Sequence, residues 1–229
     1  MGCVCPVRGR AELTKVGIVE RLKEAIVNFD VDSVKALAER ALQEGVSAYE
    51  AVIDGMAKGM EVVGQKYQQG EYFLPELIMA AETFEEGMKV LGPHLKPSEV
   101  APQGCVVIGT VEGDLHDIGK NIVASMVEAA GFQIHDLGVD VTADKFLSLA
   151  KEVSPDVVAM SALLSTTFPH MGQIIEAIRK AQIPAKTLVG GAPLSKEIAR
   201  SLGADGYGRD AVEGATICKQ WAAETRPKA

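Results

Sequence analysis

The sequence predicts two domains of different class: an all-α four-helix bundle, then an α/β, Rossmann-like (flavodoxin-like) domain with a five-stranded parallel sheet. Three observations predict this division. Apolar residues recur every three or four positions from Glu12 to Leu95, a proline-rich segment follows, and short apolar runs then alternate with helical stretches. We therefore expect a helical domain over residues 12–95, a linker over 96–103 and the α/β domain over 104–229.

Length and composition are typical of a soluble globular protein. The 229 residues are enough for two domains that each bury a core, and 47% of them are hydrophobic while 24% are charged. No apolar run approaches the ~20 residues that a membrane span needs, and the N-terminus lacks the apolar core of a secretory signal. The net charge of −8 disfavours nucleic acid as a partner. We expect a cytoplasmic protein that binds proteins and small molecules, with no nucleic acid and no membrane as partners.

Each helix of the first domain is amphipathic, with charged residues opposite the apolar stripe. The predicted helices cover residues 16–29, 34–43, 48–68 and 74–92. Asp30 or Asp32 can cap the second helix, and Ser47 with Glu50 forms a capping box for the third. Pro75 is tolerated in the first turn of the fourth. Four such helices joined by short loops predict a bundle.

The second domain alternates strand and helix. The predicted strands cover residues 105–111, 132–139, 156–164 and 185–191, with a weaker fifth at 204–208. The predicted helices cover residues 118–131, 142–153, 170–182, 194–203 and 211–224. Because the strands are β-branched or continuously apolar, we expect both faces of the sheet to be covered, which is typical of parallel strands. The alternation therefore predicts a doubly wound parallel sheet.

The segment VEGDLHDIGKNIV, residues 111–123, follows the first strand and allows two interpretations. His116 with Asp117 resembles the metal-binding pair of phosphohydrolases of the HD superfamily. Those enzymes hold the pair inside a helical domain with further His and Asp ligands, whereas here the pair follows a strand and the other histidines repeat no ligand pattern. The second interpretation, D-x-H-x-x-G with Asp114, His116 and Gly119, is therefore favoured.

A loop after the first strand of a doubly wound sheet lies beside the crevice where such sheets bind ligands. Asp114 can accept a hydrogen bond from one imidazole nitrogen of His116 and leave the other nitrogen for a metal. Gly119 removes a side chain where a bulky group would pass close to the backbone. The plainer alternatives stay open: a surface or capping histidine, a helix N-cap and an ordinary turn.

Small and hydroxylic residues follow the later strands. Ser161, Ser165, Thr166 and Thr167 lie in the last residues of the third strand or just after it, and Gly190 and Gly191 lie at the end of the fourth. Such residues suit a polar, phosphate-containing tail that lies against the sheet. The alternative is that the hydroxyls cap the helix that begins near Phe168 and that the glycines only turn the chain.

Four segments, GDLHDIGKNIV, SALLSTT, VGGAP and GADGYGRDA, resemble the B12-binding domain of corrinoid methyl-carrier proteins and of cobalamin-dependent methionine synthase. The helical half, with EYFLPELIMAAETFEEGM, resembles the cap bundle that precedes this domain. The resemblance covers the chain from about Leu13 onward. It implies a cobamide cofactor, a vitamin B12-type corrinoid that alternates between methylcobalamin and Co(I) states and is bound base-off, His-on.

The resemblance also implies roles for single residues. The implied catalytic group is His116 as the lower metal ligand of cobalt, Asp114 as its hydrogen-bonded partner, and Thr167, where methionine synthase has a serine, as the hydroxyl of a relay. The implied cofactor contacts are Gly113, Asp114, Leu115, His116, Asp117, Ile118, Gly119, Ser161, Leu163, Ser165, Gly190, Gly191 and Tyr207. Phe73 and Met79 of the helical half would shield the upper face of the corrin, and the alternative is that they are bundle core.

By this resemblance the chain is the non-catalytic methyl-carrier subunit of a methyltransferase system in the one-carbon metabolism of an anaerobe. It would shuttle a methyl group from a substrate:corrinoid methyltransferase to a second methyltransferase, whose acceptor is tetrahydrofolate or coenzyme M. A reductive activation protein would be a third partner. Methylamines, methanol, betaines and methoxylated aromatics are the donors that such systems use. The alternative is a cobalamin-binding sensor or regulatory protein, which needs a DNA-binding segment, and we expect no room for one before Leu13.

Overall fold

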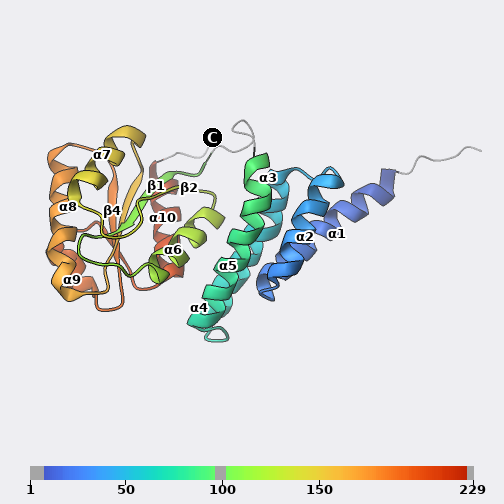
Figure 1. Cartoon of the computed structure of the whole chain (residues 1–229), viewed down its shortest axis with the longest axis horizontal. Coiled ribbons are helices and arrows are strands. Elements are labelled where there is room, and N and C mark those ends of the chain that lie inside the picture. The colour runs from blue at the N-terminus through green and yellow to red at the C-terminus, as the bar shows by residue number, and fades with distance from the viewer. Residues whose placement is uncertain (1–7, 96–101, 226–229) are drawn as a thin grey trace, which may run out of the picture. The chain divides into compact units, whose positions relative to one another are not determined.

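The computed structural model describes residues 8–95 and 102–225, and the chain divides into two compact units between Ala101 and Pro102 (Figure 1). Residues 96–101, most of the predicted linker, lie outside the described residues, as do the first seven and the last four. No described helix has the length and apolar character that a membrane crossing requires. The predicted fold class is confirmed: helices come first, and an α/β part with a five-stranded, all-parallel sheet follows.

The helical unit contains four helical segments followed by a short turn. Its elements are α1 (Arg8–Val27), α2 (Val31–Gln43), α3 (Ala48–Glu50), the π-helix η1 (Ala51–Ala57), α4 (Lys58–Gln68), α5 (Leu74–Leu91) and the 3₁₀ turn η2 (Gly92–His94). Elements α3, η1 and α4 continue one another, because the residues at their junctions keep right-handed helical backbone angles. The long third helix of the prediction therefore exists, with a π-helical segment inside it.

Capping residues determine where two of these helices begin. The carboxylate of Asp30 accepts the backbone N–H of Ser33 at 3.0 Å, so Asp30, and not Asp32, caps α2. The hydroxyl of Ser47 accepts the backbone N–H of Glu50 at 3.0 Å, which is one half of the predicted capping box. Local side-chain chemistry therefore sets the starts of α2 and α3.

Close backbone packing joins the third helical segment to α1. A Cβ atom added to Gly59 would lie 2.7 Å from the Cβ of Ile26 and 2.9 Å from the carbonyl oxygen of Lys23. A Cβ atom added to Gly55 would lie 3.1 Å from the carbonyl oxygen of Val19. Both glycines therefore face α1, and at Gly59 the approach is one that only glycine allows.

In the second unit, parallel strands carry helices on both faces (Figure 1). The strands are β1 (Cys105–Thr110), β2 (Gln133–Asp136), β3 (Val157–Ser161), β4 (Lys186–Gly190) and β5 (Gly206–Gly208), in the spatial order β2-β1-β3-β4-β5. The helices are α6 (Ile118–Ala129), α7 (Ala143–Val153), α8 (Phe168–Lys180), α9 (Lys196–Leu202) and α10 (Ala211–Thr225), with the 3₁₀ turn η3 (Ser165–Thr167) before α8. Helix α6 packs with α10 on one face, and α7, α8 and α9 pack in sequence on the other.

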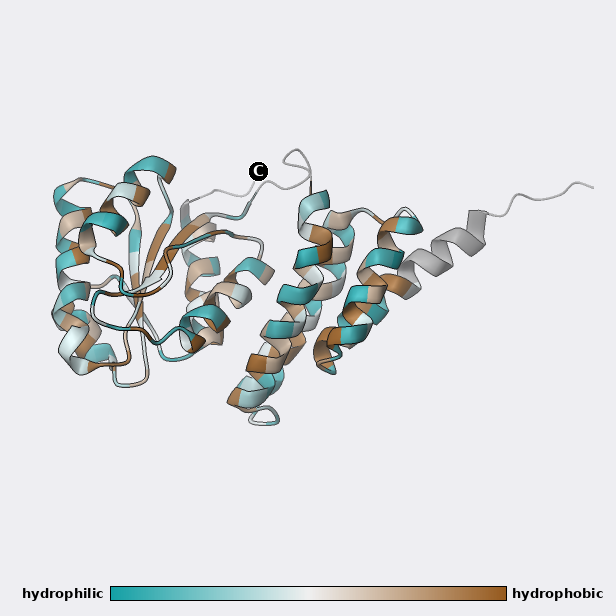
Figure 2. Cartoon of the chain, in the orientation of Figure 1, coloured by the Kyte–Doolittle hydropathy of each residue, from teal (hydrophilic) through white to brown (hydrophobic). Residues whose placement is uncertain are grey.

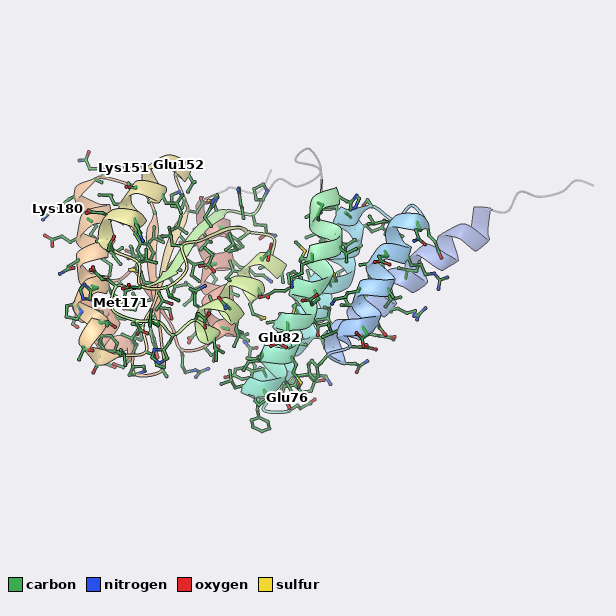
Figure 3. The ribbon with its side chains drawn as sticks, in the orientation of Figure 1. Glu76, Glu82, Lys151, Glu152, Met171 and Lys180 are labelled. Carbon is green, nitrogen blue, oxygen red and sulfur yellow. The ribbon has the colours of Figure 1, made fainter. Side chains whose placement is uncertain are left out.

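A hydrophobic core lies between the sheet and helices α7, α8 and α9. It contains Val107, Val158, Val189, Phe146 and Met171, among others. Figure 2 shows hydrophobic residues along the strands and hydrophilic residues on the outer sides of the helices. Figure 3 shows the charged side chains of Lys151 and Lys180 at the outer surface of α7 and α8. The second unit therefore has the two covered faces that the apolar strands predict.

The strand order reverses between β1 and β3. Strand β1 pairs with β2 on one side and with β3 on the other, so the connections leave these two neighbouring strands in opposite directions. In doubly wound sheets, the crevice beyond the carboxyl ends of such strands is the usual ligand site. The loops after β1 and β3, which carry most of the expected site residues, meet at this edge.

Candidate functional site

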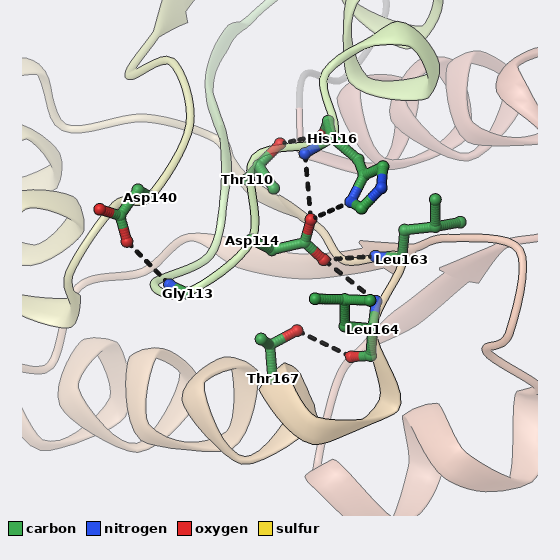
Figure 4. A network of polar contacts seen from close by, with 8 residues as sticks. All are labelled: Thr110, Gly113, Asp114, His116, Asp140, Leu163, Leu164 and Thr167. Atoms are coloured by element: carbon green, nitrogen blue, oxygen red, sulfur yellow. Dashed lines mark hydrogen bonds and ion pairs between the residues drawn. The ribbon is translucent and has the colours of Figure 1, made fainter.

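His116 and Asp114 form a hydrogen-bonded pair in the loop after β1 (Figure 4). The ring Nδ1 of His116 lies 2.6 Å from Oδ1 of Asp114, and the same oxygen accepts the backbone N–H of His116 at 3.0 Å. The side chain of Asp114 is fully buried, whereas that of His116 is 53% exposed. Because the carboxylate occupies Nδ1, Nε2 is the ring nitrogen that His116 can offer to a ligand.

The second carboxylate oxygen of Asp114 is also held by hydrogen bonds. Oδ2 accepts the backbone N–H of Leu163 at 2.7 Å and that of Leu164 at 3.1 Å, both in the loop after β3. Burial acts to raise the pKa of Asp114, but the hydrogen bonds from His116, Leu163 and Leu164 outweigh it and lower the pKa to about 2. The carboxyl group is therefore ionised at neutral pH, so it accepts the Nδ1–H proton and fixes the tautomer of the ring.

Two residues that sequence reasoning did not select hold the same loop. The buried hydroxyl of Thr110, the last residue of β1, donates to the carbonyl oxygen of His116 at 2.9 Å. The carboxylate of Asp140, in the loop after β2, accepts the N–H of Gly113 at 2.8 Å, and the N–H of Asp140 donates to the carbonyl oxygen of Asp114 at 3.0 Å. Thr110 ends β1 and Asp140 lies in the loop that follows β2, and this position beyond the carboxyl ends of the strands is the signal that could have identified them.

Thr167 lies near this loop, but its hydroxyl donates to the backbone and not to Asp114. Its Oγ1 donates to the carbonyl oxygen of Leu164 at 2.8 Å. Leu164 in turn donates its N–H to the Asp114 carboxylate. The hydroxyl of the implied relay is thus connected to the carboxylate through the backbone of Leu164 (Figure 4).

A cavity of about 260 Å³ lies between the loops after β1 and β3. It is lined by Leu115, His116, Asp117, Ile118, Gly119, Ser161, Ala162, Leu163 and Gly191. All of these residues except Ala162 were expected to contact a cofactor. Leu115, Ile118 and Leu163 are 71%, 62% and 41% exposed, so they form an apolar rim. Typical small-molecule sites measure ~300–1,000 Å³, so a corrin-sized ligand would place only a narrow part in this cavity.

The cavity wall contains two glycines, and only at one of them does the protein's own packing exclude a side chain. Gly191 has φ +144°, and a Cβ atom there would lie 1.9 Å from the carbonyl oxygen of Ala162, so the protein's own backbone excludes a side chain. A Cβ atom added to Gly119 would meet no atom within 4 Å. The protein's own packing therefore leaves room at Gly119 for a bound group that passes close to the backbone.

The remaining expected contact residues of the second unit lie outside the cavity lining. Ser165 is exposed in η3, Gly190 is the last residue of β4, and Gly113 turns the loop after β1 with φ +80°. Tyr207 packs against the core beneath α7, α8 and α9, and its hydroxyl donates to the carbonyl oxygen of Leu194 at 2.9 Å. The structure thus brings Ser161 and Gly191 to the cavity beside His116, and it places Tyr207 in the core packing.

In the helical unit, the side chains of Phe73 and Met79 are 64% and 40% exposed. Leu74, beside Phe73, is 54% exposed. Tyr72 is half-buried, and its hydroxyl donates to the carbonyl oxygen of Val27 at 3.2 Å. Phe73 and Met79 therefore do not belong to the bundle core, and their contact with a cofactor stays a prediction.

The side chains near His116 that could bind a metal limit which metal-containing group fits the site. Among the described residues, no group of three or more His, Cys, Asp or Glu side chains could hold a metal ion. Within these parts of the chain, a metal at His116 would need a cofactor to supply its other ligands. A corrin meets this requirement because its own ring nitrogens surround the cobalt, and the apolar rim beside His116 suits a flat, largely apolar ring.

The chain matches two family models, each described as a B12 binding domain, over residues 18–91 and 104–216. It is 44% identical over 204 residues to trimethylamine corrinoid protein 1 of Methanosarcina acetivorans, with 87% of this chain and 94% of the relative covered. Its structure is similar to that of a cobalamin-binding protein from Desulfitobacterium hafniense, with a TM-score of 0.69 and 32% identity over 89% of this chain and 98% of the other. It is also similar to a chain of the methanol:cobalamin methyltransferase complex MtaBC from Methanosarcina barkeri, with a TM-score of 0.79 and 27% identity over 97% of this chain and 86% of that chain.

Proposed function

The chain belongs to the family of corrinoid proteins that are built from B12-binding domains, and we propose that it carries a methyl group on a bound cobamide between two methyltransferases. The family membership confirms the predicted resemblance and the predicted cofactor, a cobamide. One relative is a trimethylamine corrinoid protein, and one structural neighbour is a methanol:cobalamin methyltransferase complex. These relationships support a methyl carrier with methyltransferase partners.

The observation that carries the proposal is the pairing of His116 with the buried carboxylate of Asp114 at the wall of an open cavity. When bound, the cobamide supplies a cobalt centre that accepts a methyl group from one partner and gives it up to another. Asp114 occupies Nδ1, so His116 offers Nε2 as the ligand atom. The ionised carboxylate makes the ring a stronger ligand and holds its orientation. We therefore propose base-off, His-on binding with His116 as the protein ligand.

The residues around the cavity are proposed to bind the lower face and the tail of the cofactor. The apolar rim of Leu115, Ile118 and Leu163 would pack against the corrin and exclude water from the ligand bond. Ser161 would form a hydrogen bond with the polar tail, and the open space at Gly119 would let that tail pass. The site thus combines one metal ligand with an apolar surface and a narrow polar cavity.

The helical unit is proposed to shield the upper face of the corrin with Phe73 and Met79. Their exposed apolar side chains support this role, because large apolar groups in a bundle usually pack into its core. A hydrophobic cover keeps water and oxidants away from a reactive metal. It would have to withdraw whenever a partner enzyme transfers the methyl group.

We propose a methylated amine as the source of the methyl group, because several relatives are trimethylamine or dimethylamine corrinoid proteins. The first partner would be a methyltransferase that takes the methyl group from such an amine. The second would pass it to coenzyme M or tetrahydrofolate. A reductive activation protein would restore the carrier after accidental oxidation of the cobalt.

Anaerobic reconstitution with hydroxocobalamin tests the proposed mode of cofactor binding, in which His116 is the protein ligand. The wild-type protein should take up the cofactor and, after reduction to Co(II), show nitrogen splitting from an axial imidazole in its electron paramagnetic resonance (EPR) spectrum. His116→Ala should lose this splitting, whereas His135→Ala, a matched control on the edge strand β2, should keep it. A protein that takes up no cobamide, or a His116→Ala spectrum like that of the wild type, would contradict the proposal.

A transfer assay tests the carrier role. The loaded, reduced protein is mixed with a trimethylamine:corrinoid methyltransferase and isotope-labelled trimethylamine. Labelled methyl groups should become bound to the protein, up to one per cobamide, and a second methyltransferase should release them to its acceptor. Label that never becomes protein-bound from trimethylamine, dimethylamine or monomethylamine would exclude methylamines as donors.

A further inference from the structure

Asp140 joins the loop after β2 to the loop that carries His116. Its carboxylate accepts the N–H of Gly113, and its own N–H donates to the carbonyl oxygen of Asp114. These two hydrogen bonds, at 2.8 and 3.0 Å, run in opposite directions and bind two successive residues of the His116 loop. Asp140 therefore holds the backbone just before His116 in place.

The backbone of Asp140 has a left-handed conformation, with φ +53°. Among the described residues, the other non-glycine residues with positive φ are Phe29, Ser154 and Gln182, and each lies within two residues of a helix end. Left-handed residues are common where helices end, but Asp140 lies in the loop between β2 and α7. Because this conformation costs free energy in a residue with a side chain, we infer that the bonds to the His116 loop favour it.

The loop that carries Asp140 is fixed on both sides. After it, the N–H of Val141 donates to the backbone of β1 at 3.0 Å. Before it, the N–H of Gly138 donates to the carboxylate of Asp136 at 2.8 Å, and Asp136 is also paired with the buried Lys120 of α6. The residues on both sides of Asp140 are therefore held by hydrogen bonds, so Asp140 can fix the position of the His116 loop.

We propose that Asp140 is a positioning residue for cobalt ligation. It holds Gly113 and Asp114 where the Asp114 carboxylate meets both the His116 ring and the amides after β3. Asp140 does not line the cavity, so it acts through Asp114. This role rests on the proposed function, in which His116 binds the cobalt of a cobamide. Groups that orient a metal ligand from outside typically change metal affinity about 10- to 100-fold when removed.

Three substitutions separate the side chain of Asp140 from its backbone conformation. Asp140→Gly removes the carboxylate and adopts positive φ freely, whereas Asp140→Ala removes it and leaves the backbone strained. Asp140→Asn keeps an oxygen that can accept the Gly113 N–H, and asparagine tolerates the left-handed conformation. Ser154→Gly is the backbone control because Ser154 has φ +49° at the end of α7, and Asp144→Ala removes an exposed carboxylate from the start of that helix.

Two measurements test whether Asp140 holds the His116 loop and supports cobalt ligation. In the cofactor-free protein, amide hydrogen exchange measured by nuclear magnetic resonance should become faster at Gly113 in Asp140→Gly and Asp140→Ala. In protein reconstituted with hydroxocobalamin and reduced to Co(II), the equilibrium constant for His116 coordination should fall about tenfold or more in these two variants. It is read from the visible spectrum and from the nitrogen splitting of the EPR spectrum. Asp140→Asn and both controls should stay within about twofold of the wild type.

The outcomes separate this proposal from the one on which it rests. A wild-type protein without an imidazole ligand on cobalt would overturn both. Imidazole ligation in the wild type that is unchanged in Asp140→Gly and Asp140→Ala would overturn the role of Asp140 alone. The role of Asp140 would also be overturned if Asp140→Asn weakened His116 coordination as much as Asp140→Ala does, because the effect would then not depend on the hydrogen-bond acceptor. Faster exchange at Gly113 together with weaker ligation, both restored by asparagine, would support it.

Discussion

The Nδ1 atom of His116 and the Oδ1 atom of Asp114 lie 2.6 Å apart, which joins a half-exposed ring to a fully buried carboxylate by a short, charge-assisted hydrogen bond. The carboxylate remains charged in the interior because N–H groups of His116, Leu163 and Leu164 surround both of its oxygens. An exposed ring in a surface loop thereby keeps one orientation and one tautomer.

Asp114→Asn should weaken His116 coordination and destabilise the fold. An amide cannot accept hydrogen bonds on both sides, so either the ring or the amides of Leu163 and Leu164 lose their partner. We expect about 10- to 100-fold weaker imidazole ligation of cobalt and a loss of about 1–3 kcal/mol in the free energy of unfolding. Spectra of the reconstituted protein and urea denaturation of the cofactor-free protein measure the two effects. Unchanged ligation would show that the carboxylate does not support the ring.

The stability of the cofactor-free protein should depend on Asp114 at acidic pH. Its pKa is depressed from 3.8 to about 2 on folding, so its contribution is fully present above the unfolded value and is lost as the pH falls through the folded value. The linkage contributes roughly 2 kcal/mol at neutral pH, of which about 1 kcal/mol is lost between pH 6 and pH 3. Urea denaturation at these two pH values should show a loss larger by this amount in the wild type than in Asp114→Asn. Equal losses would contradict the low pKa.

Gly119→Leu should fold normally and bind cobamide poorly. An added side chain at Gly119 meets no protein atom near its Cβ, so the folded state has room for it. The same side chain would occupy the space where the cofactor's tail is proposed to pass. Thermal unfolding of the cofactor-free protein and titration with hydroxocobalamin separate the two effects. Gly17→Leu, at another open glycine on α1, is the matched control and should bind cobamide like the wild type.

Thr167→Val should leave His116 ligation nearly unchanged. The hydroxyl donates to the Leu164 carbonyl, so its loss removes one hydrogen bond that is worth about 1 kcal/mol of stability. No bond to Asp114 is lost with it. The fraction of imidazole-ligated cobalt, followed as a function of pH, should match that of the wild type and of Thr167→Ser. A shifted pH profile in Thr167→Val alone would instead support a relay that includes this hydroxyl.

Gly59→Ala should destabilise the helical unit although alanine is the better helix former. The new methyl group would lie 2.7 Å from Ile26 and 2.9 Å from the carbonyl oxygen of Lys23, so α1 and α4 must separate. Such overpacking typically costs about 1–3 kcal/mol. Urea denaturation measures the loss, and Gly17→Ala, where nothing lies within 4 Å, should be neutral or slightly stabilising. Equal stability of the two variants would contradict the close contact.

The helices and strands around the site could be predicted because the spacing of apolar residues indicates them. Part of the site could also be predicted, because some of its contacts join residues that are close in the sequence. Asp114 and His116 are two residues apart in a loop, and their pairing follows from this short separation. The contacts of Asp114 with Leu163 and Leu164 could not be predicted, because backbone N–H groups leave no mark in the sequence. The contact with Asp140 depends on how two loops meet in space, which no local pattern reports.

Tyr207 shows how a motif can select the right segment without giving the direction of a side chain. Side chains alternate between the two faces of a strand. A Cβ atom on Gly206 would approach Trp221, and one on Gly208 would approach Gly214, both on α10. Tyr207 therefore faces away from α10, into the core beneath α8. The π-helical segment η1 was missed for a related reason, because apolar residues spaced three and four apart do not reveal one widened turn.

The loop that presents His116 is tied to the ends of three neighbouring strands. The loop forms hydrogen bonds with Thr110 at the end of β1, with Asp140 in the loop after β2, and with the amides of Leu163 and Leu164 just after β3. These anchors lie at or just beyond the ends of three adjacent strands of one sheet, so the position of the histidine depends on the sheet and not on its own loop alone. His116 is therefore anchored to the sheet through these hydrogen bonds. If a cobamide binds at His116 as proposed, we expect the histidine to keep its position relative to the sheet whether the cofactor is bound or released.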